Sequence, residues 1–172
     1  WAHGYASGGG PGVGATMAEN KPDGFGMTTH LRFDVTSLQG LYGAIERVTI
    51  RLTAKETQPS RVGGRILAHR MTTANAGWDS GSTWATQNGT DAWAGGSNGG
   101  LVPGTDYVDE LLASTAFMNA NPAGYQHDLV ISGAAAQRLI DDWSNPDNPN
   151  EGFVLHATIP AEDKGNRLGL YA

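Results

Sequence analysis

Strict alternation between apolar and polar residues is the feature that most limits how this chain folds. It occurs in residues 30–35 and again in residues 46–53, where every second residue is apolar. Because successive side chains of a strand point to opposite faces, this period of two predicts β-strands with one buried face and one outward face. The inward side chains are Leu31, Phe33 and Val35 in the first stretch and Val48, Ile50 and Leu52 in the second.

Shorter patterns elsewhere predict further strands and one helix. The expected strands cover residues 13–18, 65–71, 125–131, 152–157 and 167–171. The helix is expected near residues 133–144, with Ser132 as its N-cap and Pro146 as its stop. Its apolar residues fall on one face, at the helical spacing of i, i+3, i+4 and i+7: Ala136, Leu139, Ile140 and Trp143. Residues 109–117 are expected to form one or two helical turns.

Many short strands with a single helix predict an all-β fold, a two-sheet antiparallel β-sandwich. We expect one domain over residues 1–172, with a Gly-rich N-terminal segment (1–27) and a long aromatic-bearing loop region (72–124). One core should gather the inward residues of both sheets and the helix. Its expected members are Phe33, Val48, Ile50, Leu52, Leu129, Ile131, Leu139, Trp143, Phe153 and Leu155.

Composition narrows the classes of function. The chain has 25 glycines and only 16% charged residues, which is typical of β-rich domains with many tight turns. Its net charge of −6, without a basic cluster, argues against nucleic acid as a partner. No apolar run approaches the ~20 residues of a membrane-spanning helix, so no membrane insertion is expected. The absence of cysteine excludes disulfides and thiolate metal sites.

Several motifs, in one order along residues 28–172, resemble those of a known family. Residues 31–38 (LRFDVTSL), 45–52 (IERVTIRL) and 78–84 (WDSGSTW) are similar to the strand, turn and tryptophan elements of the DNRLRE-type domain. Residues 129–143 and 150–155 (NEGFVL) are similar to its strand-and-helix element and its following strand. Residues 1–27 match poorly, residues 94–119 read as an insertion, and the charged ending of the family is missing.

The DNRLRE-type domain occurs in secreted bacterial and archaeal proteins and is related to alginate-type carbohydrate-binding modules. The resemblance implies a jelly-roll-like β-sandwich that is secreted or displayed at the cell surface, usually as an accessory module. It does not by itself identify a ligand, because the shared residues are mainly those that make the fold.

Exposed aromatic residues are the main candidates for ligand binding. An indole ring stacks on the apolar face of a sugar ring, and loops of a sandwich commonly display such residues. The candidates are Trp78, Trp84, Trp93 and Tyr107, all in the long loop region. Trp93 and Tyr107 are expected to be exposed. The alternative for Trp78 and Trp84 is that they plug the open end of the sandwich.

Two groups of charged or polar residues are further candidates. Outward His30 and His69 are expected to meet on neighbouring strands with Arg32 and Arg70, as a polar patch suited to an acidic sugar. A polysaccharide lyase would use such a cluster. A calcium site is the second possibility, with ligands from Asp106, Asp109 and Glu110. The alternative there is that these acids are solvated or cap turns.

These observations lead to a non-catalytic extracellular module that binds a polysaccharide, with calcium as its only candidate cofactor. One alternative is a structural subunit of a filament, matrix or surface layer, in which the N-terminal strand pairs with an identical subunit. A third is a small polysaccharide-active enzyme. The sequence leaves the sugar and the oligomeric state open.

Overall fold

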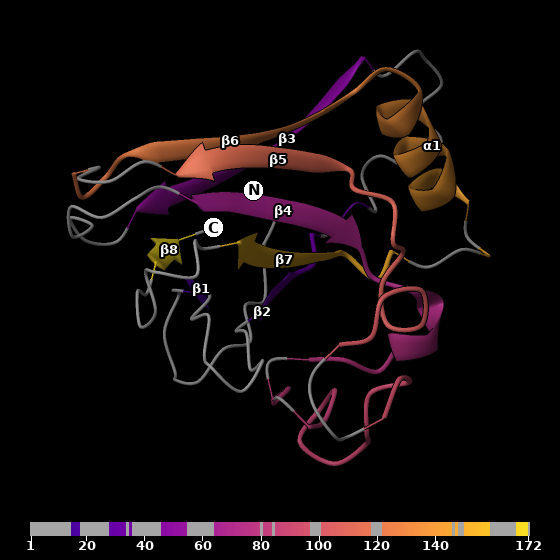
Figure 1. The fold of residues 1–172 in the computed structure, drawn as a ribbon. Coiled ribbons are helices and arrows are strands. Elements are labelled where there is room, and N and C mark those ends of the chain that lie inside the picture. The colour runs from indigo at the N-terminus through magenta and orange to yellow at the C-terminus, as the bar shows by residue number, and fades with distance from the viewer. Residues whose placement is uncertain are drawn as a thin grey trace.

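The described part of the chain folds into two antiparallel four-stranded sheets and one α-helix (Figure 1). We analysed a computed structural model. It describes residues 15–17, 28–33, 35, 46–54, 64–79, 81–83, 85–96, 101–117, 122–145, 147, 150–158 and 168–171. The strands are β1 (Ala15–Met17), β2 (Thr28–Leu31), β3 (Arg47–Ala54), β4 (Gly64–Arg70), β5 (Ala113–Phe117), β6 (Gln126–Ser132), β7 (Phe153–Thr158) and β8 (Leu168–Tyr171). A short 3-10 helix, η2 (Thr73–Asn75), follows β4.

The strands pair as a set of nested hairpins. The first sheet has the order β1-β8-β3-β6 and the second has the order β2-β7-β4-β5. Strand β4 pairs with β5, β3 with β6, β2 with β7 and β1 with β8, always antiparallel. Successive nested pairs therefore alternate between the two sheets. The two-sheet antiparallel arrangement predicted from the sequence is confirmed at this level.

One apolar core joins the two sheets and the helix. It combines inward residues of the first sheet, such as Ile50 and Leu129, with inward residues of the second, such as Ile66 and Phe153. Eight of the ten expected core residues are buried; Phe33 and Val48 are partly buried and pack against this core. Strand β2 ends at Leu31, earlier than expected, yet the alternation of residues 31–35 still orients Phe33 toward Phe153.

The helix α1 (Gly133–Ser144) confirms the expected bounds. Its buried residues are the four that the helical spacing selects: Ala136, Leu139, Ile140 and Trp143. Ser132 precedes it with extended backbone, but its side chain makes no capping hydrogen bond. The first residue, Gly133, has a φ of 59°, which glycine tolerates at this sharp strand-to-helix junction. In the described part of the chain, no helix is long and apolar enough to cross a membrane.

The helical turns expected in residues 109–117 are wrong, because Ala113–Phe117 is strand β5. It pairs with β4 over five residues, from Ala113 opposite Ala68 to Phe117 opposite Gly64. The leucines and acids before this strand favour a helix locally. Pairing with the edge of β4 outweighs that local preference. The short N-terminal strand β1 pairs with β8 of the same chain.

Candidate functional site

The second sheet has two differently built faces. Its inner face carries Leu31, Phe153 and Leu155, which belong to the main core. Val154, between Phe153 and Leu155, and His30, just before Leu31, point to the other face. Val154 belongs to a second apolar cluster. That cluster is completed by Met71, Trp78, Trp93 and Tyr107. Residues of the long loop region therefore cover the outer face of this sheet. We call the described residues from Thr72 to Leu111 the cover.

Aromatic rings of the cover pack on histidines of the sheet. The His30 ring lies 4.9 Å from the Trp93 ring and 5.7 Å from the Trp78 ring, centroid to centroid. Tyr107 lies 5.0 Å from His69. Trp93 is 2% exposed and Tyr107 is 6% exposed, so the predicted exposure of these two residues is wrong. Trp78 is buried as well, in the apolar cluster on the outer face of this sheet. Trp84 lies outside the described residues.

Burial of the histidines favours their neutral form. Desolvation lowers the pKa of His30 from 6.5 to about 4, and the negative charge of Asp106 offsets only part of this effect. The pKa of His156 is also lowered, mainly by burial and further by the adjacent His69. Burial raises the pKa of the Tyr107 hydroxyl, and Asp109 and Asp106 add to the increase. At neutral pH the outer face therefore holds His30 and His156 in their neutral form, packed against aromatic rings of the cover.

The outward polar patch expected from His30, Arg32, His69 and Arg70 is not formed. His30 and His69 are both buried, and β7 separates their strands, so each lies opposite Val154 from a different side. The alternation correctly assigned both histidines to the face away from the core. It could not reveal that another segment covers this face. Arg32 and Arg70 are partly buried and each forms an ion pair.

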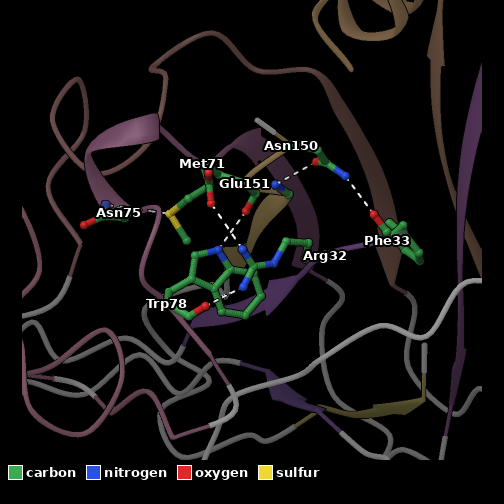
Figure 2. Close-up of polar contacts among 8 residues, drawn as sticks. Arg32, Phe33, Met71, Asn75, Trp78, Asn150 and Glu151 are labelled. Atoms are coloured by element: carbon green, nitrogen blue, oxygen red, sulfur yellow. Dashed lines mark hydrogen bonds and ion pairs between the residues drawn. The ribbon is translucent and has the colours of Figure 1, made fainter. Parts of the chain in front are cut away.

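Arg32 anchors the cover to the end of β2 (Figure 2). Its guanidinium lies 4.6 Å from the Trp78 ring centroid, donates to the Trp78 carbonyl, and pairs with Glu151 at 3.3 Å. The Trp78 indole Nε1 donates to the Glu151 carbonyl at 2.8 Å. Burial raises the pKa of the Glu151 carboxyl, while Arg32 opposes the shift. The predicted ligand residues Trp78 and Arg32 thus form a structural joint.

A tight approach of the backbone supports this joint. Asn150 donates from its Nδ2 to the Phe33 carbonyl at 2.7 Å and accepts from the Gly152 backbone N–H at 2.9 Å (Figure 2). Gly152 has a φ of 82°, and a Cβ there would lie 2.9 Å from the Arg32 Cα. Only glycine fits both conditions. The family-like segment 150–155 therefore holds the start of β7 against the end of β2.

Asp106 is a buried support of the cover and not an open metal ligand. Its carboxylate accepts from the backbone N–H groups of Gly95 at 2.9 Å and Val102 at 2.6 Å, and from Asn75 Nδ2 at 3.0 Å. Asp109 and Glu110 are exposed, and Glu110 pairs with Arg138. Within the described residues, no three His, Asp or Glu side chains are close enough to hold a metal ion. The expected calcium group is therefore not assembled from these three residues.

A charged groove lies between α1 and the part of the cover that leads into β5. Two adjoining cavities, of about 340 and 210 Å³, share Arg70, Val108 and Asp142. The larger is lined further by Glu110, Leu112, Ala135, Arg138, Leu139 and Asp141; the smaller by Met71, Thr72, Thr73, Trp143 and Glu151. Arg70 pairs with Asp142, and Arg138 pairs with Glu110 at 2.7 Å. The groove is therefore lined both by apolar side chains and by paired charges.

Sequence reasoning found only part of this groove. It singled out Arg70 and Glu110, but for a patch and a metal site that the structure does not form. It considered Asp142 only as one of the acids at the helix exit that could bind calcium, and it assigned Arg138 no role because Arg138 is an ordinary solvent-side position of a helix. A charged helix face predicts no partner until the neighbouring segment is placed.

Comparisons of the chain with protein-family models, with curated proteins and with solved structures found no match.

Proposed function

We propose that the chain is a non-catalytic extracellular module that binds a polysaccharide in the groove between α1 and β5. The observation that carries the proposal is the pair of adjoining cavities that share Arg70, Val108 and Asp142. The larger, at about 340 Å³, falls in the range of ~300–1,000 Å³ common for small-molecule sites. The second cavity continues it, as a chain of linked sugar units requires.

The chemistry of the groove suits sugar rings. Sugars present apolar C–H faces together with hydroxyl groups that both donate and accept hydrogen bonds. Val108, Leu112 and Leu139 offer apolar surface, while the Arg70–Asp142 and Arg138–Glu110 pairs offer donors and acceptors at fixed positions. Five of the nine residues that line the larger cavity are charged, so hydrogen bonds to sugar hydroxyl groups would dominate recognition there. The groove replaces the aromatic stacking platform predicted from the sequence.

We further propose that the two sheets form a jelly roll. Its support is the nested pairing of β1 with β8, β2 with β7, β3 with β6 and β4 with β5, distributed alternately over two sheets. One long hairpin wound around a common core produces this order, which is that of double-sheet jelly rolls. The secreted or surface location rests on the resemblance to the DNRLRE-type domain. Both points support an accessory binding role.

The proposal is tested by affinity electrophoresis through gels that contain a neutral glucan or an anionic uronan. Arg138→Ala should weaken binding on the order of tenfold, because hydrogen bonds of a charged group typically contribute about 1.5–3 kcal/mol. Arg51→Ala is the matched control. Arg51 also forms an exposed ion pair at 2.7 Å, with Asp128, but on the outer face of the first sheet.

Equal migration of the wild type and Arg138→Ala through every retarding gel would exclude the groove as the site. Retardation lost in Arg51→Ala instead would move the site to the first sheet. If no polysaccharide retards the wild type and the protein elutes as a large species in gel filtration, the filament-subunit alternative replaces the binding module.

A further inference from the structure

A layer of histidines joins the cover to the second sheet. His30, His69 and His156 come from three different strands, β2, β4 and β7, and all point to the covered face. Each ring contacts an aromatic ring of the cover: His30 contacts Trp93, and both His69 and His156 contact Tyr107. The contact between the cover and the sheet therefore passes through groups that can gain a charge near neutral pH.

The pair of His69 and His156 lies where added charge is hardest to accommodate. Their ring centroids are 5.0 Å apart, edge to face. His69 Nδ1 lies 3.2 Å from the Val108 carbonyl, and His156 Nε2 is buried without a hydrogen-bond partner among the described residues. Two positive charges at this separation repel each other strongly in a poorly solvated site. A proton on His156 would also lie buried without an acceptor, which disfavours the closed contact.

The charged groups around the layer offset this repulsion only in part. The negative charge of Asp106, in the cover, raises the pKa of His30 and of Tyr107. The charge of Asp109 also raises the pKa of Tyr107, whose ring contacts both His69 and His156. On the sheet itself, the neighbouring His69 lowers the pKa of His156. At the other end of the histidine layer, Arg32 lies over the Trp78 ring. Among the described residues, the acidic groups of the cover thus act chiefly on His30 and Tyr107.

We infer that acidification releases the cover from the second sheet while the two-sheet core stays folded. The direction follows from linkage. Histidines that are neutral under the cover bind protons more readily once it opens, so falling pH shifts the equilibrium toward the open form. The main core carries aliphatic side chains and the rings of Trp143 and Phe153, and none of the three histidines belongs to it. The cover is therefore a pH-dependent strap over one sheet.

His127 is the group that most resembles the layer and must be separated from it. It lies buried on β6 of the first sheet, next to Tyr125, and burial lowers its pKa. Protonation of His127 would destabilise the core itself, and the cover would then be lost only as part of global unfolding. A reporter for each layer distinguishes these two events.

The test is a pH titration of the indole N–H signals in two-dimensional NMR, from about pH 7.5 to about pH 4. Trp78 and Trp93 report on the cover, because their Nε1 atoms donate to the Glu151 and Thr83 carbonyls. Trp143 reports on the core. Trp→Phe substitutions assign the signals. We expect the signals of Trp78 and Trp93 to move to solvent-exposed positions while that of Trp143 stays in place.

His156→Gln removes one proton site but keeps a polar side chain, and His30→Gln does the same at the ring that packs on Trp93. Each should lower the midpoint of the cover transition by at least ~0.5 pH unit, whereas His127→Gln should leave it unchanged. Loss of the Trp143 signal together with those of Trp78 and Trp93 would overturn the inference. So would a midpoint that neither His156→Gln nor His30→Gln moves.

Discussion

The two faces of the second sheet are built from the same strands but by different means. On the inner face, Leu31, Ile66 and Leu155 meet side chains of the first sheet in a continuous apolar core. On the outer face, His30 and His69 meet aromatic rings of the cover, and buried polar groups such as Asp106 hold that cover in shape. The inner face depends on burial of hydrocarbon, and the outer face depends on ring contacts and specific hydrogen bonds.

This difference teaches what an alternating pattern means. In β7, Phe153 and Leu155 face the core, and Val154 between them is equally buried. Alternation identifies the face on which a side chain lies, but solvent reaches the second face only where nothing covers it. The first sheet gives the contrast, since Val130 on its outer face is 45% exposed.

The largest effect is expected from the inner face. Phe153 is completely buried, and its ring lies 5.5 Å from Trp143 and 6.1 Å from Phe33. Phe153→Ala should lower the free energy of unfolding by about 3–5 kcal/mol, because it removes hydrocarbon and leaves a cavity. Urea denaturation measures this change. A loss below about 1 kcal/mol would mean that this face is not the shared core.

A smaller and more local effect is expected in the cover. Asp106→Ala leaves the N–H groups of Gly95 and Val102 without their acceptor. These bonds are partly buried, and a hydrogen bond to a charged group typically contributes about 1.5–3 kcal/mol. Hydrogen exchange should rise sharply in the cover and little in β3 and β6. Exposed Asp109→Ala is the control, and an equal rise in both variants would contradict the role of Asp106.

The next largest effect is expected from acid, which should lower the free energy of unfolding through the histidines of the outer face. The pKa of His30 is lowered to about 4 in the folded protein, whereas its ordinary value is 6.5. The unfolded chain therefore binds the extra proton in this window, and stability falls as the pH decreases through it. Between pH 7 and pH 5 this histidine alone accounts for about 2 kcal/mol. Urea denaturation of the wild type and His30→Gln at both pH values should show a smaller loss in the variant.

The smallest effect is expected on the outer face of the first sheet, where Val130 is exposed among the described residues. Val130 lies there opposite Thr49, outside any apolar cluster. Val130→Ser should change the free energy of unfolding by less than about 0.5 kcal/mol, because it removes little buried surface. A thermal melt is sufficient to measure it. A loss as large as that of a core substitution would show that a segment covers this face as well.

Sequence patterns predicted the regular parts of the molecule and missed those made by distant contacts. The period of two placed Ile50, Leu52, Leu129 and Ile131, and the helical spacing placed Trp143. Strand β5 was missed because its small residues, Ala113 to Phe117, carry no strong pattern until β4 pairs with them. The burial of Trp93 and Tyr107 was missed for a related reason. Their partners, His30 and His69, lie tens of residues away.

The closing of the outer face by the cover is tested most directly by hydroxyl-radical footprinting at neutral pH. Tyr125 is 46% exposed and serves as the internal reference for an accessible ring. Trp93 and Tyr107, at 2% and 6% exposed, should be oxidised far more slowly than Tyr125. Oxidation of Trp93 and Tyr107 as fast as that of Tyr125 would show that these rings face solvent and that the second sheet has no cover.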